Sequence, residues 1–219
     1  MLDFQIAPEI AGRVCVGLLV LEGVSVRESD PALDAEVDRT CASFRERHGG
    51  GKSSEVPGAA DARTLYKALG IDPTKTRPSN EALLRRALKG ETLYRINTLV
   101  DALNLVSLRT QLPFGLYDLD RVRPPVVLRK GKAGEGYDGI RKGFVNVEAR
   151  PVLMDLEGPF GNPTSDSART MITLSARNAL VVAYAPAGYN LGRLNGVLDA
   201  TAETLVRFCG GTRADSRIL

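Results

Sequence analysis

The residues best suited to chemistry gather in one turn-rich segment, GPFGNPTSDSART, at 158–170. It brings hydroxyl groups, a carboxylate and a guanidinium close together in the chain: Thr164, Ser165, Asp166, Ser167, Arg169 and Thr170. In a pocket, a carboxylate can orient a water molecule or bind an ammonium group, and hydroxyls can donate hydrogen bonds to a developing oxyanion. The same side chains are equally suited to closing turns, so both interpretations stay open.

A second polar cluster lies upstream, in NTLVDALNLVSL at 97–108 and LPFGLYD at 112–118. The helical period places the apolar side chains Leu99, Val100, Leu103 and Val106 on one side of the first segment and the polar side chains Asn97, Asp101 and Asn104 on the other. Such groups could bind a small zwitterion, with carboxylates holding its ammonium and amides or hydroxyls holding its carboxyl or ester. Capping of helices is the structural alternative.

Several kinds of catalytic site lack their residues in this chain. His48 is the only histidine and lies beside three glycines, so a triad would have to be built on that one residue. The three cysteines are far apart and odd in number, which favours neither a disulfide framework nor a zinc site. The phosphate-binding motifs GxxxxGK[ST] and strand-linked GxGxxG are also missing. We therefore predict no cofactor and no metal.

Positive charge is concentrated between Arg63 and Arg95, where eight Lys and Arg accompany three Asp and Glu, although the whole chain carries only +3. Phosphate contacts with RNA are one interpretation, and a solvated basic helix face is the other. The candidates for RNA binding are Lys75, Arg77, Arg85, Arg86 and, outside this segment, Arg169. For Arg169 an ion pair with Asp166 is the alternative.

The predicted helices lie mostly in the first half of the chain. Asp30-Pro31 is a cap and first-turn pair that opens a helix ending at His48. Ser79 is the predicted N-cap of the helix NEALLRRALK, and Gly90 follows its end. Further helices are expected at 60–69, 97–108 and 191–208.

Strands are expected in the second half, after one buried strand at 14–21. From Pro125 onward, short β-rich runs are separated by turn residues, in VVLR, GFVNV, PVLMDL, MITL and ALVVAYA. Helices followed by strands indicate an α+β fold with a mainly antiparallel sheet and packed helices. The length and average composition of the 219 residues favour one domain over 1–219. With no basic leader and no apolar run long enough to span a bilayer, we expect a cytoplasmic protein.

Taken together, these segments resemble a known family. The stretches at 77–122 and 125–139 are similar to the tRNA-editing domain of the phenylalanyl-tRNA synthetase beta subunit, and more closely to the free-standing B3/B4 domain proteins. The matching positions are Arg85-Arg86, Ile96-Asn97, Val100-Asp101, Asn104, Leu112-Pro113, Tyr117-Asp118, Arg129 and Glu135. The segment at 158–170 resembles the signature P.G.PTSDS.RT of the free-standing proteins. Order and spacing agree over about 60–210.

The resemblance implies an α+β domain with a pocket on one face of a sheet and, for the synthetase, hydrolysis of mischarged tyrosyl-tRNA. Two positions depart from that pattern. Gly115 stands where the synthetase has a histidine, and Val182 stands where it has a glutamate. Because those two residues contribute to recognition and hydrolysis in the synthetase, its tyrosine specificity does not carry over. The hydroxyl-rich turn then becomes the best candidate for the pocket wall.

Our hypothesis from the sequence is a deacylase that acts on mischarged tRNA in trans, as part of translation quality control. Its partner is tRNA or aminoacyl-tRNA, and neither a membrane nor DNA. The alternatives are a non-catalytic module of the same fold that binds tRNA, a free amino acid or a metabolite, and an interaction domain without a ligand. The candidate catalytic side chains are Asp166, Ser165 and Ser167. The candidate pocket residues are Asn97, Asp101, Asn104, Gly115, Tyr117, Asp118 and Thr164.

Overall fold

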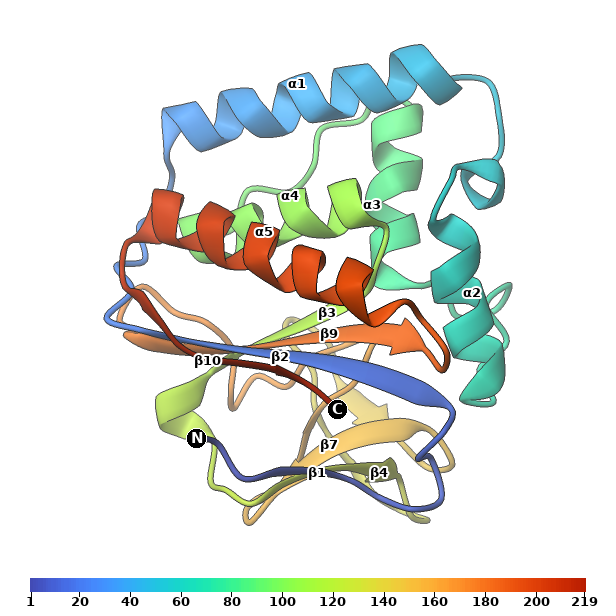
Figure 1. The fold of residues 1–219 in the computed structure, drawn as a ribbon, viewed down its shortest axis with the longest axis vertical. Helices are drawn as coiled ribbons and strands as arrows, with labels where there is room; N and C mark the ends of the chain where they lie inside the picture. The colour runs from blue at the N-terminus through green and yellow to red at the C-terminus, as the bar shows by residue number, and fades with distance from the viewer.

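The computed structural model describes residues 1–219 and arranges them in three layers (Figure 1). Most of the helices cover one face of a four-stranded sheet of order β10-β2-β9-β3, and a second four-stranded sheet of order β1-β4-β7-β8 covers the other face. The helix at residues 59–68 packs instead against the core between the two sheets. A two-stranded ribbon pairs β5 with β6. Most strand pairs are antiparallel, so the α+β class expected from the sequence is confirmed. None of the α-helices is both long and apolar enough to cross a membrane.

The elements have the following bounds in chain order. The first half of the chain contains β1 (Phe4–Ile6), β2 (Val14–Glu22), α1 (Pro31–His48), the 3-10 turn η1 (Ser53–Glu55), α2 (Ala59–Ala68), α3 (Ser79–Leu88) and α4 (Thr98–Thr110). The second half contains β3 (Phe114–Asp118), η2 (Leu119–Arg121), β4 (Val126–Lys130), β5 (Gly136–Asp138), β6 (Phe144–Asn146), β7 (Pro151–Asp155), β8 (Gly158–Gly161), β9 (Asn178–Pro186), α5 (Leu191–Cys209) and β10 (Thr212–Ile218).

The middle sheet explains why β2 and β9 are apolar along their whole length. Successive side chains of a strand point to opposite faces of the sheet. In β2, Leu19 and Leu21 pack in the core under the helices, whereas Leu18 and Val20 pack in a second core between the two sheets. Both faces are therefore buried, and the buried strand predicted at 14–21 is confirmed.

Local signals set the ends of the long helices. The Asp30 carboxylate accepts hydrogen bonds from the Ala32 and Leu33 amides at 2.9 and 3.1 Å, so the predicted cap of α1 is confirmed. The predicted end at His48 is confirmed as well. Gly90, after α3, adopts a φ of +73°, the left-handed conformation that commonly ends helices.

Two local predictions are wrong. Pro78, and not Ser79, holds the capping position of α3, because the Ser79 hydroxyl donates to the Pro163 carbonyl at 3.3 Å and makes no cap contact. The predicted strand MITL at 171–174 is a loop with no strand partner. Several strands were not expected from the sequence. Three of them pair with distant segments of the chain, namely β1, β3 and β10, and two pair with a neighbouring strand, namely β5 and β8.

One aromatic side chain joins the two sheets. Tyr117, in the edge strand β3, is fully buried between them and packs edge-on against Phe160 of β8, with ring centroids 4.9 Å apart. Its ring lies across two glycines, one in each sheet. A Cβ added at Gly115 would lie 2.2 Å from the Tyr117 hydroxyl oxygen, and one added at Gly161 would lie 2.3 Å from it. Only glycine at both positions leaves room for this ring.

Replacing Gly115 by Ala therefore overfills the space between the sheets. We expect the variant to lose about 2–3 kcal/mol of unfolding free energy, because an added methyl in a filled core displaces its neighbours. Chemical denaturation of the variant and the wild type measures this difference.

Gly196 in α5 supplies the matched control, because an added Cβ there meets no atom within 4 Å. Gly196→Ala should gain about 0.5–1 kcal/mol from helix propensity. Equal stability of Gly115→Ala and the wild type would contradict the packing described for Tyr117.

Candidate functional site

A cavity of about 930 Å³ lies beside the edge strand β3. Its walls are formed by α3, α4, β3 and two loop segments, residues 140–142 and 163–174. Phe114 and Leu116 of β3 face this cavity, while Gly115 and Tyr117, on the other face of the strand, point to the second sheet. The cavity thus combines apolar walls with polar groups from a helix and from the turn-rich segment.

One face of α4 forms the helical wall. Asn97, Val100, Asn104 and Ser107 recur at three- and four-residue spacing and all line the cavity. Asn97 is also the N-cap, since its side-chain oxygen accepts the Val100 amide at 3.0 Å. The sequence placed Val100 and Leu103 opposite the two asparagines, which is wrong, because both also line this wall. Because α4 is buried on nearly every side, it has no solvent-exposed face to which its polar residues would be confined, and polar and apolar side chains share one wall.

Hydrogen bonds fix the turn that follows β8. The Asn162 side chain accepts the amides of Thr164 and Ser165 at 2.8 and 2.9 Å, which is an Asx turn. The Thr164 hydroxyl contacts the buried Tyr66 hydroxyl at 3.0 Å, and the Tyr137 hydroxyl donates to the Ser165 carbonyl. The turn is therefore held in place, and the Ser165 hydroxyl makes no hydrogen bond of its own.

Asp166 is the ionisable group most perturbed by its place in this cavity. The residue is half-buried, but its Oδ1 atom is shielded from solvent and has no hydrogen-bond partner. Burial raises the pKa of Asp166 to about 7, and the neighbouring Tyr117 hydroxyl, the Leu116 amide and the charge of Lys142 offset part of this effect. A carboxyl group with a pKa near neutrality can both accept and release a proton at physiological pH. The hydroxyls of Tyr117 and Tyr184 are also buried without a partner.

Arg141 and Lys142 supply positive charge at the cavity, and neither was expected from the sequence to be a site residue. Both are exposed and line the cavity, in the turn between β5 and β6. Arg141 adopts a φ of +52°. The adjacent basic pair in a Gly-bounded turn, GIRKG, was the available signal. Apolar side chains also lie exposed at the cavity, namely Ile96, Ile140 and Leu174.

The structure brings five of the candidate site residues together on the cavity wall: Asn97, Asn104, Thr164, Ser165 and Asp166.

The remaining candidates have other contacts. The Asp101 carboxylate accepts the Ile96 amide at 3.1 Å, and Asp118 caps η2 by accepting the Asp120 amide at 3.2 Å. The Ser167 hydroxyl is buried against that of Thr170, 3.0 Å away. These three side chains hold the local backbone and do not line the cavity.

Gly115 and Val182, the two positions that depart from the synthetase pattern, are direct partners across the β3–β9 pair. Val182 is fully buried in the core between the sheets, and the Tyr117 ring fills the space above Gly115. Neither residue lines the cavity. In this chain, both positions serve the packing of the two sheets.

Three of the candidate RNA-binding cations are exposed and form neither an ion pair nor a side-chain hydrogen bond: Lys75, Arg77 and Arg85.

The other two are held by protein groups. Arg86 donates to the Thr92 carbonyl and pairs with Glu91 at 3.2 Å. Arg169 pairs with Asp155 at 2.8 Å and with Glu157 at 3.1 Å, so the expected alternative of a pair with Asp166 is wrong. The Asp155 side chain is fully buried, which makes Arg169 a link between β7 and the turn-rich segment.

The fold resembles a solved structure. The N-terminal fragment of the phenylalanyl-tRNA synthetase beta subunit from Pyrococcus horikoshii aligns with a TM-score of 0.51 and 13% sequence identity. The alignment covers 97% of this chain and 50% of that chain, so the protein spans half the length of the synthetase fragment. At this identity the likeness shows the fold alone.

Sequence comparison gives a more direct assignment. No curated protein matches the chain. The family model described as the B3/4 domain matches residues 61–211, which include most of α2, the elements from α3 to α5 and every lining residue of the cavity except Glu28. Because this match covers most of the chain, the protein belongs to the B3/4 domain family.

Proposed function

We propose that the protein is an aminoacyl-tRNA deacylase that hydrolyses the ester of mischarged tRNA in the cavity between α4 and β3. The observation that carries this proposal is the position of Asp166, whose shielded, unpartnered oxygen and raised pKa occur in a cavity lined by hydrogen-bonding groups. Membership of the B3/4 domain family and the likeness to a tRNA synthetase fragment support tRNA as the partner.

An aminoacyl ester is already activated, so its hydrolysis mainly requires a positioned water molecule and donors for the oxyanion. In the proposed reaction the Asp166 carboxylate accepts a proton as the water oxygen bonds to the ester carbonyl carbon. The free Ser165 hydroxyl donates to the carbonyl oxygen, on which negative charge develops. When the bond to the ribose oxygen breaks, Asp166 returns the proton to that oxygen, and the products are an amino acid and uncharged tRNA.

The remaining cavity residues suggest how the substrate is held. Val100, Leu103 and Phe114 provide apolar contact area for an amino-acid side chain, and Asn104 offers an amide to the substrate's polar groups. Arg141 and Lys142 are placed to contact phosphates of the tRNA end, because both are exposed at the same cavity.

The second candidate function is a non-catalytic module that binds tRNA or a free amino acid in the same cavity. One observation favours it: the positions aligned with the synthetase's histidine and glutamate have become part of the core, under Tyr117. In this case Asp166 would bind the ammonium group of the ligand and perform no proton transfer.

Replacing Asp166 by Asn should lower deacylation of the preferred mischarged tRNA by about 10²–10⁴-fold, the usual contribution of a general base. For the wild type, kcat/KM should rise with pH around an apparent pKa near 7, because the carboxylate is the active form. A panel of correctly and incorrectly charged tRNAs, corrected for spontaneous hydrolysis, measures both effects.

Asp138→Asn is the matched control, because Asp138 is an exposed carboxylate in β5 that does not line the cavity. It should retain wild-type activity. Two results together would favour the binding module over the deacylase. The protein would hydrolyse every tRNA only at the background rate, and it would bind a free amino acid in a way that Asp166→Asn abolishes.

The stability of Asp166→Asn tests the environment of the carboxyl group separately from activity. With a pKa of about 7 in the folded state and about 3.9 in the unfolded state, the folded protein binds more protons between these values. The contribution of Asp166 to the unfolding free energy of the wild type therefore falls as the pH rises from 4 to 7.

The Asn variant should be more stable than the wild type at pH 8, on the order of 2 kcal/mol, and the difference should shrink toward pH 4. Thermal or chemical denaturation across this pH range provides the measurement. A stability difference independent of pH would show that Asp166 is not desolvated in the folded protein.

A further inference from the structure

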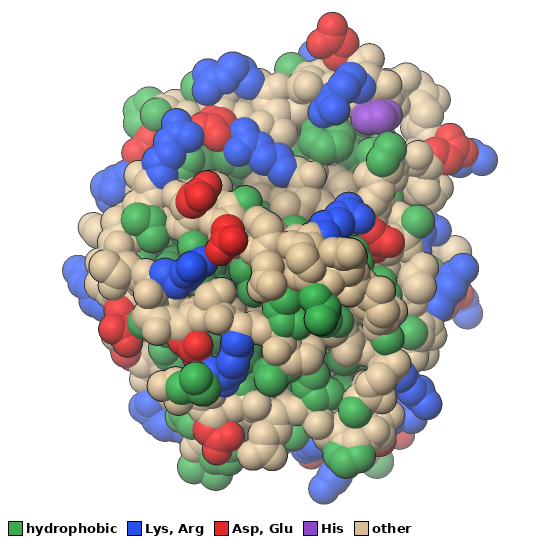
Figure 2. Space-filling model, viewed as in Figure 1, with side chains coloured by type: hydrophobic (Ala, Val, Ile, Leu, Met, Phe, Trp, Pro, Cys, Tyr) green, Lys and Arg blue, Asp and Glu red, His purple; other side chains and the backbone are tan.

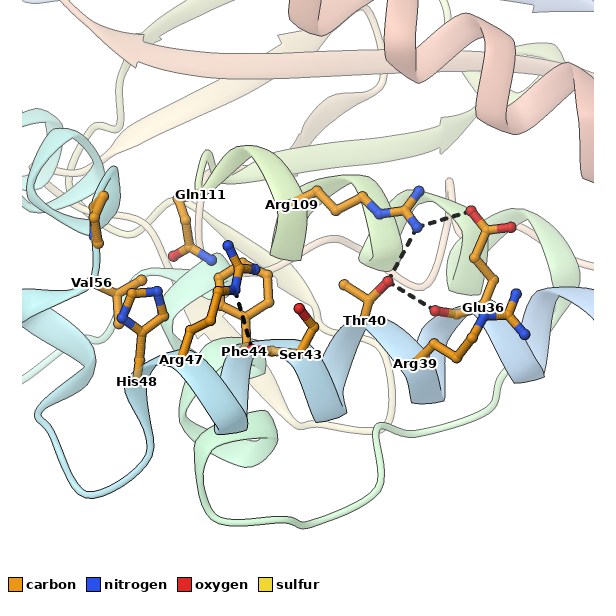
Figure 3. A pocket seen from close by; sticks show the side chains of 11 residues that line it. Glu36, Arg39, Thr40, Ser43, Phe44, Arg47, His48, Val56, Arg109 and Gln111 are labelled. Atoms are coloured by element: carbon orange, nitrogen blue, oxygen red, sulfur yellow. Dashed lines mark hydrogen bonds and ion pairs between the residues drawn. The ribbon is translucent and has the colours of Figure 1, made fainter.

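A second cavity, of about 440 Å³, opens between α1, the C-terminal end of α4 and residues 56–57 (Figure 3). We call it the α1–α4 groove. It is separate from the proposed deacylase cavity. Arg109, which lines the groove, follows Val100, which lines the other cavity, by nine residues, or two and a half helical turns. These two side chains point to opposite sides of α4, and the two cavities share no lining residue.

The groove carries an excess of positive charge. Arg39, Arg47 and Arg109 line it, and Glu36 is its only carboxylate. Glu36 is shared, because it pairs with Arg109 at 2.9 Å and with Arg207 at 3.0 Å. Lys and Arg side chains also gather over α1 on the face shown in Figure 2.

Two of the three guanidinium groups have no acidic partner. Arg39 is exposed and forms no ion pair. Arg47 donates to the Ser43 carbonyl at 3.2 Å and lies 5.1 Å from the centre of the Phe44 ring. In Figure 3, the Ser43 side chain lies between Arg47 and Arg109. Planar guanidinium groups and a free hydroxyl are the donors that suit a phosphate group.

Gln111 provides an independent indication of a ligand. It is only 2% exposed, and its side-chain nitrogen donates to the Leu108 carbonyl at 2.6 Å. That bond fixes the amide orientation, because a carbonyl can only accept. The side-chain oxygen of Gln111 is then buried without a partner, and the residue lines the groove. An unpaired buried acceptor costs about 1–3 kcal/mol unless a donor such as a ligand hydroxyl reaches it.

The backbone conformation at position 111 does not itself favour glutamine. Residue 111 ends α4 with a φ of +58°, a conformation that glycine or asparagine adopts more readily. The long amide side chain there has two effects: its nitrogen binds the Leu108 carbonyl near the helix end, and its oxygen is left as an unpaired acceptor in a residue that lines the groove.

We propose that the α1–α4 groove binds a phosphate monoester carried on a hydroxylated body, such as the ribose 5-phosphate part of a free nucleotide. Arg47, Arg109 and the Ser43 hydroxyl bind the phosphate, and the Gln111 oxygen accepts a hydrogen bond from a hydroxyl of the body. The cavity volume is in the range of small-molecule sites. This inference does not depend on the proposed deacylase activity, because the two cavities share no lining residue.

The test is calorimetric titration of the full chain with inorganic phosphate, ribose 5-phosphate, ribose, and a single-stranded RNA oligonucleotide that lacks terminal phosphates. We expect the wild type to bind ribose 5-phosphate more tightly than inorganic phosphate and not to bind ribose. Arg47→Gln should lower the affinity for both phosphate ligands at least tenfold. Arg13→Gln, which removes an exposed arginine without a side-chain partner elsewhere on the surface, should leave both affinities unchanged.

Two further variants keep the test informative if a substitution disturbs folding. Gln111→Met should weaken the binding of ribose 5-phosphate several-fold and leave the affinity for inorganic phosphate unchanged, since the hydroxyl contact is the only proposed ligand contact that it removes. Glu36→Gln releases Arg109 and should tighten phosphate binding, a gain that misfolding cannot produce. Glu46→Gln, an exposed acid on α1 without an ion pair, is its control.

Either of two results would overturn the proposal. In the first, the wild type binds neither inorganic phosphate nor ribose 5-phosphate. In the second, the Arg47→Gln variant binds both ligands as tightly as the Arg13→Gln control does. Tighter binding of the RNA than of ribose 5-phosphate, lost in Arg47→Gln, would also overturn it and identify the groove as a contact for RNA phosphodiesters.

Discussion

The Tyr117 ring, lying across Gly115 and Gly161, is the contact on which the rest of the structure depends. It fills the space between the two sheets, and it fixes β8 relative to β3. The turn-rich segment continues directly from β8, so the position of Asp166 beside the cavity follows from this contact. Because neighbouring residues of a strand face opposite ways, the same strand that buries Tyr117 presents Phe114 and Leu116 to the cavity.

The packing around Tyr117 determines which residues are available to the cavity. The positions aligned with the synthetase's histidine and glutamate, Gly115 and Val182, face the core between the sheets and are occupied by its packing. In the cavity, the turn-rich segment contributes the carboxyl group of Asp166, and burial keeps its pKa near neutrality. Burying an ionisable group without a partner costs stability, which is common where function requires a reactive group.

The sequence predicted features that local signals determine. Asp30-Pro31 encodes the start of α1 through capping, and the apolar run at 14–21 encodes a strand covered on both faces. The polar residues Asn97, Asn104, Thr164, Ser165 and Asp166 were selected from their types and from the family resemblance, and all of them line one cavity.

Features set by distant contacts could not be predicted from the sequence. β1 is only three residues long and pairs with β4, more than one hundred residues away. Serine is a residue type that commonly caps helices, but the Ser79 hydroxyl donates its hydrogen bond to a carbonyl of the turn-rich segment. The MITL run has strand composition, but no strand lies beside it, and it became part of the cavity wall.

The most direct test of the central claim is a crystal structure of the protein with an aminoacyl-adenosine analogue in which an amide replaces the ester. We expect the aminoacyl group of the analogue to bind in the cavity between α4 and β3, with its carbonyl carbon next to a water molecule held by Asp166. An analogue bound outside this cavity, or bound within it with the carbonyl group remote from Asp166, would contradict the account.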